Sequence, residues 1–215
     1  MSIRFDSEEF VLLKKILPSY EWAQRTMMTK LDIIKESLVH NQVSNNPIGQ
    51  IVSRIKTPES IAEKLQRQKL DITAESAKEH LKDIAGIRII CPYERDISIL
   101  VAIIKNIPDI NVLVEKDYVN NPKPSGYRSY HLIIEIPIYH VVEMEHVPLE
   151  IQLRTEGMNF WSTLEHEAKY KYQENIPQHL SDELIICAQK IAELDKRMFL
   201  IHELISLIND ENEGK

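Results

Sequence analysis

A short stretch near residue 150 combines side chains suited to acid–base and phosphate chemistry. Residues 145–155 read "EHVPLEIQLRT", in which aliphatic and polar side chains alternate. Because successive side chains of a strand point to opposite faces, Glu150, Gln152 and Arg154 are expected on one face. A carboxylate, an amide and a guanidinium in a row can accept a proton and bind phosphate. A half-exposed sheet with a polar outer face would show the same alternation, so this strand does not decide between the two interpretations.

A second acidic residue lies at the start of another apolar run. Asp83 precedes "IAGIRIICPY", which also contains Arg88. An acidic residue in this position can simply cap a turn. However, two carboxylates on neighbouring strands can share Mg²⁺, which takes few protein carboxylates and fills its other positions with water and phosphate oxygens. We therefore predict a Mg²⁺ site at Asp83 and Glu150.

Basic and hydroxyl side chains bracket these two acids along the chain. Each of them alone is typical of a solvated surface, but together they surround the predicted metal. A metal held by two acids and ringed by cations is what phosphoryl-transfer chemistry requires. The residues are Arg54, Lys56, Ser60 and Lys64 before Asp83, and Lys116, Lys123, Arg128 and His131 before Glu150.

An aromatic pair adds a second kind of recognition. The stretch "KPSGYRSYHLIIEIP", residues 123–137, changes from a loop to an apolar strand and places Tyr127, Tyr130 and His131 at the transition. These side chains either pack or bind a flat, anionic ligand. Tyr130 is expected to pack, because it faces away from His131 once the strand has begun.

The elements that must position these residues form three regions. Residues 6–17 and 20–43 are predicted as two helices separated by Pro18 and ended by Asn45–Pro47. The middle region interleaves helices with strands, which indicates an α/β or α+β architecture around a central sheet. The expected helices cover 58–68, 73–81, 96–106 and 159–172, with Phe160, Trp161 and Leu164 in the core, and the expected strands cover 86–92, 110–119, 130–139 and 146–155.

The third region is one long helix, predicted from Leu180 to Asn209. Apolar residues recur every seven positions in two series offset by three, an a/d pattern over four heptads. This predicts a helix that takes part in oligomerisation, and packing within the chain is the alternative. The series are Leu184, Ile191, Met198 and Ile205, and Cys187, Leu194, Ile201 and Ile208.

Composition restricts the class of protein. The 215 residues suit one large domain, and the net charge of −7 means that any nucleotide site must be a local basic patch. Cys91 and Cys187 lack metal-ligand spacing and are expected to be reduced core residues. No apolar run approaches the about 18 residues of a membrane span, and the first residues are polar, so a cytoplasmic location is expected.

Several motifs in a fixed order resemble the synthetase domain of the RelA/SpoT family, which makes the alarmones ppGpp and pppGpp. They are "RIK…S…K", "DIAGIRIIC", "KPSGYRSYHL", "EIQLRT" and "MNFWSTLEH", within residues 47–172. The resemblance implies a small alarmone synthetase of α+β class, with a nucleotidyltransferase-like mixed sheet flanked by helices. The expected division is N-terminal helices over 1–46, a synthetase domain over 47–177 and an oligomerisation helix over 178–215. Homotetramers are typical of such small members.

The resemblance also implies roles on the ATP side. The adenine would lie between Arg54 and Arg88, since guanidinium groups stack on aromatic faces. The phosphates would be held by Lys56, Ser60 and Lys64. Asp83 and Glu150 would bind Mg²⁺, and Glu150 would be the general base for the 3′-hydroxyl of GDP or GTP.

On the acceptor side, the resemblance implies that Tyr127 stacks on guanine and that Asn159 reads the guanine edge. Gln152 would help to position the ribose. Lys116, Lys123 and His131 would meet the 5′-phosphates of the acceptor.

Two alternatives remain open at this stage. One is another nucleotidyltransferase that modifies a protein or RNA. The other is a catalytically silent module that binds nucleotide or single-stranded RNA through Tyr127 and the cations. Two carboxylates in the site disfavour the silent module, because a pure polyanion binder gains nothing from them.

Overall fold

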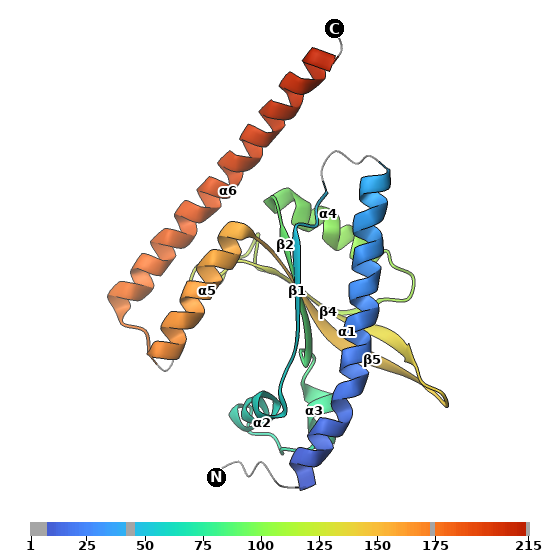
Figure 1. The fold of residues 1–215 in the computed structure, drawn as a ribbon. Helices are drawn as coiled ribbons and strands as arrows, with labels where there is room; N and C mark the ends of the chain where they lie inside the picture. The colour runs from blue at the N-terminus through green and yellow to red at the C-terminus, as the bar shows by residue number, and fades with distance from the viewer. Residues whose placement is uncertain (1–7, 42–45, 173–174, 214–215) are drawn as a thin grey trace.

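The computed structural model describes residues 8–41, 46–172 and 175–213. Helices and strands are interleaved through the middle of the chain, as expected (Figure 1). The helices are α1 (Glu8–His40), α2 (Pro58–Arg67), α3 (Ala74–His80), α4 (Glu94–Lys105), α5 (Glu156–Lys171) and α6 (Gln178–Glu213). The strands are β1 (Gln50–Ile55), β2 (Ala85–Cys91), β3 (Asn111–Asp117), β4 (Tyr130–Tyr139) and β5 (Met144–Thr155).

The five strands form one mixed sheet in the order β1-β2-β5-β4-β3. The central pair, β2 and β5, is parallel, and the other three pairs are antiparallel. This confirms the predicted α+β class with a central mixed sheet. The segment before α2 was not among the expected strands, and it forms the edge strand β1.

The sheet is apolar on one face and polar on the other. Alternate residues of the central strands, such as Ile87, Ile151 and Leu132, are fully buried in the main core. Helix α1 crosses this face and α4 packs beside it, while α5 and α6 lie on the other side of the sheet in Figure 1. Because strands alternate strictly, the residues between the buried ones all point to the opposite, polar face.

The expected break at Pro18 is wrong, since α1 continues through it. The helix buries a continuous stripe that includes Leu13, Ile16, Tyr20 and Ala23 on both sides of the proline. Pro18 itself lies on the exposed side, where solvent can replace the hydrogen bond that proline cannot donate. Residues 6, 7, 42 and 43 of the two predicted helices lie outside the described residues.

Two core predictions are also wrong. On α5, Trp161 is buried, but Phe160 is 69% exposed and Leu164 is 45% exposed, because α5 buries only the stripe through Met158, Trp161 and Glu165. Cys91 is buried as expected, whereas Cys187 on α6 is exposed. Both errors come from reading apolar type without knowing which stripe of a helix meets the domain.

Helix α6 packs on the domain along one side, through Leu184 and Ala188 in its first half and through Phe199 and His202, which contact Tyr93, in its second half. Leu184 and Ala188 join Tyr127 and Trp161 in a second, smaller core cluster. Beyond that point the heptad residues Leu194, Met198, Ile201, Ile205 and Ile208 are each between 51% and 57% exposed. In the described part of the chain, no helix is both long and apolar enough to cross a membrane.

Candidate active site

The polar face of the sheet brings the predicted residues together in rows that run across the strands. His131 on β4 pairs with Gln152 on β5, which pairs with Arg88 on β2. Lys116 on β3 extends this row beyond His131. The neighbouring row joins Arg54, Gly86 and Glu150. The sheet register therefore brings residues as far apart in sequence as Arg54 and Gln152 onto one surface.

A cleft of about 210 Å³ opens over β1, β2 and β5. Arg54 and Arg88 line it from adjacent strands, and Glu150 and Gln152 line it from β5. A side chain at Gly86 would lie 3.8 Å from Cγ of Arg54, so glycine keeps the space beside this arginine open. The cleft thus has two guanidinium groups and a carboxylate around a space suited to a flat ring.

Asp83 is held between two lysines next to this cleft. Its Oδ2 lies 2.9 Å from Nζ of Lys56 and 2.6 Å from Nζ of Lys64. Burial raises the pKa of Asp83, but the hydrogen bonds and charges of Lys64 and Lys56 outweigh it and leave the pKa below its ordinary value. Burial lowers the pKa of Lys56, and the Asp83 charge only partly offsets this.

The start of α2 positions the phosphate-binding candidates. Thr57 caps the helix by accepting a hydrogen bond from the backbone N–H of Ser60. Ser60 is exposed in the first turn, and Lys64 follows one turn later, where it reaches Asp83. The helix therefore presents a hydroxyl and an ammonium group on the same side.

One feature of Asp83 fits the predicted Mg²⁺ site. Oδ1 of Asp83 is buried and has no hydrogen-bond partner, so one carboxylate oxygen is available for a cation. The described residues contain no group of three or more acidic, histidine or cysteine side chains around a common point. A divalent ion here would therefore take most of its ligands from nucleotide phosphates and water, as Mg²⁺ commonly does.

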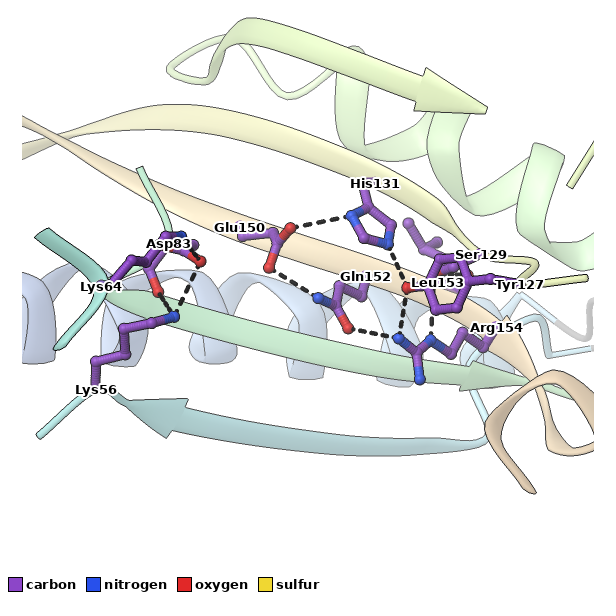
Figure 2. A network of polar contacts seen from close by, with 10 residues as sticks. All are labelled: Lys56, Lys64, Asp83, Tyr127, Ser129, His131, Glu150, Gln152, Leu153 and Arg154. Carbon is purple, nitrogen blue, oxygen red and sulfur yellow. Dashed lines mark hydrogen bonds and ion pairs between the residues drawn. The ribbon is translucent and has the colours of Figure 1, made fainter. Parts of the chain in front are cut away.

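Glu150 lies at the centre of the polar network in Figure 2, between Asp83 and the aromatic cluster. Its Oε1 is 3.0 Å from Nδ1 of His131, and its Oε2 accepts a hydrogen bond of 2.8 Å from the amide of Gln152. Burial raises the pKa of Glu150, but the His131 and Gln152 contacts outweigh it and lower the pKa. The carboxylate is thus ionised and held in one orientation.

Tyr127 is less accessible than its predicted role suggests. Its ring is only 8% exposed and packs with Trp161 and Leu184. The Nζ of Lys123 lies 4.8 Å from the centre of the ring, and the hydroxyl lies 2.8 Å from Nε2 of His131. For a guanine to stack on Tyr127, the exposed Lys123 must leave the ring.

Asn159 lies in the first turns of α5, where it meets the cleft. Arg88 donates a hydrogen bond of 3.4 Å to its side-chain oxygen. Thr155 caps α5 by accepting from the N–H of Met158 and donates to Asp195 on α6 at 2.6 Å. This places Asn159 beside Arg88. Arg128 instead donates to Glu94 and to the carbonyl oxygen of Val119, away from these residues.

Sequence reasoning gave no role to Arg154, the third polar residue of the β5 face. The guanidinium is buried and donates to the hydroxyl of Tyr127 at 2.7 Å and to Oε1 of Gln152 at 3.1 Å. The period-two alternation correctly placed Arg154 beside Gln152. Its burial could not be inferred from the strand, because α5 and the loop before β4 cover it only in the folded chain.

Comparisons with known proteins identify the relatives of this chain. Residues 53–175 match the family model described as "Region found in RelA / SpoT proteins". The chain is 43% identical over 187 residues to GTP pyrophosphokinase YwaC of Bacillus subtilis, covering 86% of this chain and 88% of that protein. It is 36% identical over 185 residues to GTP pyrophosphokinase YjbM of the same organism, covering 86% of each.

Solved structures are similar over almost the same extent. The crystal structure of small alarmone synthetase 1 from Bacillus subtilis bound to its product pppGpp has a TM-score of 0.83 and 34% identity, covering 90% of this chain and 97% of that chain. Small alarmone synthetase 2 from the same organism has a TM-score of 0.79 and 40% identity, covering 88% of this chain and 97% of that chain. On the family match, the identities and the shared fold, this chain belongs to the RelA/SpoT family.

Proposed function

We propose that the protein is a (p)ppGpp synthetase that transfers the β,γ-pyrophosphate of ATP to the 3′-hydroxyl of GDP or GTP. The observation that carries the proposal is the position of Glu150. Its carboxylate lines the cleft with Arg54 and Arg88 and is also bonded to His131 beside Tyr127. A single base therefore lies between a candidate ATP site and a candidate acceptor site.

On the ATP side, the adenine lies in the cleft between Arg54 and Arg88. The exposed guanidinium of Arg54 and the half-buried one of Arg88 can each stack on a ring face. Lys56, Ser60 and Lys64 bind the phosphates. Because both lysines are paired with Asp83 in this structure, the phosphates take over lysine contacts that the carboxylate now makes.

On the acceptor side, guanine stacks on Tyr127 after Lys123 has moved, and Asn159 binds the guanine edge. Gln152 orients the ribose. Lys116, Lys123 and His131 are the candidates for the 5′-phosphates, and Lys116 and His131 are cross-strand neighbours. The two carboxylates Asp83 and Glu150 weigh against the alternative of an RNA-binding module, because a binder of polyanions gains nothing from them.

Chemistry begins when Glu150 accepts the proton of the 3′-hydroxyl. The 3′-oxygen attacks the β-phosphorus of ATP, the bond from that phosphorus to the oxygen shared with the α-phosphate breaks, and AMP leaves. The contacts of His131 and Gln152 keep Glu150 ionised before the reaction. Mg²⁺, held by Asp83 and Glu150 together with phosphate oxygens, would neutralise charge on the transferred group.

We also propose that the chain assembles into a homo-oligomer, expected to be a tetramer, through the exposed heptad stripe in the second half of α6. The heptad stripe from Leu194 to Ile208 has no cover in the described chain. A continuous apolar stripe of this kind is typical of a helix that packs against another helix.

A transfer assay with two matched variants tests the proposed reaction. The protein, Mg²⁺, β-labelled ATP and GDP should yield labelled guanosine tetraphosphate and an equal amount of AMP. Glu150→Gln should lower turnover by about 10²–10⁴-fold, since the general base is lost. Glu143→Gln, an exposed residue of the same hairpin, should leave it unchanged. Normal turnover in Glu150→Gln would refute the mechanism, and no labelled product from the wild type would refute the function.

A further inference from the structure

We propose that Arg154 is a positioning residue that orients both the Glu150 carboxylate and the Tyr127 hydroxyl. One of its guanidinium nitrogens donates two hydrogen bonds, and each of them starts a chain of hydrogen bonds, called an arm, that ends at Glu150. The proposal rests on the proposed function, in which Glu150 is the base and Tyr127 carries the guanine. Figure 2 shows the arrangement, with Arg154 at one end of the network and Glu150 near its centre.

Arg154 is a buried cation whose recorded hydrogen bonds all go to uncharged groups. Its side chain is 4% exposed. Nε donates to Oγ of Ser129 at 3.3 Å, and the Ser129 hydroxyl donates in turn to the carbonyl oxygen of Leu153. Burying a guanidinium without a direct carboxylate partner costs free energy. We therefore infer that its hydrogen bonds to neighbouring side chains have a role in the site.

The first arm is a chain of hydrogen bonds in which every donor points away from Arg154 and toward Glu150. Arginine has no acceptor, so Nη2 must donate to the Tyr127 oxygen, at 2.7 Å. The Tyr127 proton is then directed to Nε2 of His131, at 2.8 Å. With Nε2 as an acceptor, the hydrogen of a neutral His131 ring lies on Nδ1, which is 3.0 Å from Oε1 of Glu150.

The second arm reaches the other oxygen of the same carboxylate. Nη2 also donates to Oε1 of Gln152 at 3.1 Å, which turns the amide so that Nε2 donates to Oε2 of Glu150 at 2.8 Å. The two hydrogens of Nη2 thus start two arms that end on the two oxygens of Glu150. The ring Glu150–His131–Tyr127–Arg154–Gln152 is closed, and each of its bonds has a defined donor.

This geometry requires arginine. A guanidinium carries its donors in a rigid plane, whereas an ammonium group on a flexible stem has no fixed fork. Lysine at position 154 carries its three donors on one rotating nitrogen, so it does not reproduce the Nε bond to Ser129 together with two arms of fixed direction. Arg154 also packs against the Tyr127 ring, with its guanidinium carbon 5.2 Å from the ring centre, and therefore supports the stacking surface from inside the fold.

Three variants test the proposal. Arg154→Lys should lower kcat by about 10–100-fold, the usual loss when a group that orients a reacting residue is removed, with the KM for ATP unchanged. Tyr127→Phe keeps the ring but removes the hydroxyl, and so breaks only the first arm. Arg25→Lys, on an exposed arginine of α1, is the matched control and should behave as the wild type.

A second readout does not depend on turnover. At one fixed pH, ¹⁵N resonances of the ligand-free protein should show His131 protonated on Nδ1 in the wild type and as a mixture of tautomers in both Arg154→Lys and Tyr127→Phe. Unchanged His131 resonances together with normal kcat in Arg154→Lys would overturn the proposal. If Arg154→Lys does not fold, Tyr127→Phe decides, and wild-type tautomers in that variant would overturn it. Absence of pyrophosphate transfer by the wild type would refute the proposed function. The His131 resonances of the ligand-free variants would then still test whether Arg154 orients the network.

Discussion

Lys56, Lys64 and Asp83 form a group of three charges in which one carboxylate oxygen serves two ammonium groups. In the proposed reaction the lysines bind phosphate and the carboxylate binds a cation. On substrate binding, the ion pairs between the lysines and Asp83 are therefore replaced by ion pairs with phosphate and the cation. Little unpaired charge is buried either before or after binding. This limits the cost of keeping a charged site ready inside the fold.

The pKa of Asp83 gives this pairing a measurable pH dependence. The pKa lies below the ordinary value of 3.8, so the folded chain binds this proton less tightly than the unfolded chain does. Ionised Asp83 therefore stabilises the fold above that value, and the contribution disappears as the pH falls through the lowered pKa. Asp83→Asn should reduce the free energy of unfolding by about 1–3 kcal/mol near neutral pH, and the difference from the wild type should shrink in acid.

Urea denaturation of both proteins over a series of pH values measures this difference. Asp71→Asn, on an exposed residue nearby, is the control and should show no such pH dependence. A difference between Asp83→Asn and the wild type that stays constant into acid would mean that the two lysine pairs do not stabilise the fold.

At the same scale, residue type and spacing predicted much of the candidate site. Period two along β5 correctly predicted that Glu150 and Gln152 share a face, and the strand start predicted the neighbouring position of Asp83. The burial of Tyr127 and the contacts of Arg154 could not be predicted, because they depend on α5 and α6 packing over the loop before β4. Such contacts join segments far apart in sequence, and no local pattern records them.

At the scale of elements, the loop that carries Lys123 and Tyr127 is held against α6 at Gly126. This residue has a φ of +90°, and an added Cβ would lie 2.7 Å from Cβ of Ala188. Gly126→Ala should therefore lower the free energy of unfolding by about 1–3 kcal/mol, through backbone strain and overpacking. Thermal and urea unfolding measure this loss.

Gly86→Ala is the matched control for stability. Its added Cβ would meet its nearest neighbour at 3.8 Å, an ordinary contact, and its backbone is that of a normal strand. The control should unfold like the wild type. Equal stability of Gly126→Ala would show that the loop can move away from α6 without cost.

The sequence predicted the elements well where local signals were strong. Helices α2 and α3, capped by Thr57 and Thr73, and strands β2, β4 and β5 lie within a few residues of their predicted bounds. The prediction failed at Pro18, where tertiary packing of a long apolar stripe overrides a local helix breaker. It also failed on the outer face of α5, because its apolar residues do not all meet the domain.

At the scale of the whole molecule, the exposed stripe of α6 makes the proposed assembly testable. The double variant Leu194→Glu with Ile201→Glu places two charges on the heptad stripe, where a helix–helix interface would have to bury them. Sedimentation should then show a smaller species than the wild type at the same concentration. Lys196→Glu, on the opposite side of the heptad, should sediment like the wild type, and an unchanged mass of the double variant would place the interface elsewhere.

Strand β5 lies at the centre of the sheet but is the last strand in sequence, so the sheet cannot be completed until β5 has been synthesised. Strands β1 and β2 form one antiparallel pair and β3 and β4 another, and only β5 joins them. Pairs of strands alone are marginally stable, so a nascent chain that stops before β5 begins at Met144 has two separate strand pairs and no complete sheet. Glu150, Gln152 and Arg154 lie on this last strand, so a chain whose translation is interrupted earlier contains neither the base nor the frame that would hold its substrates. A copy that ends before β5 therefore cannot carry out the proposed pyrophosphate transfer.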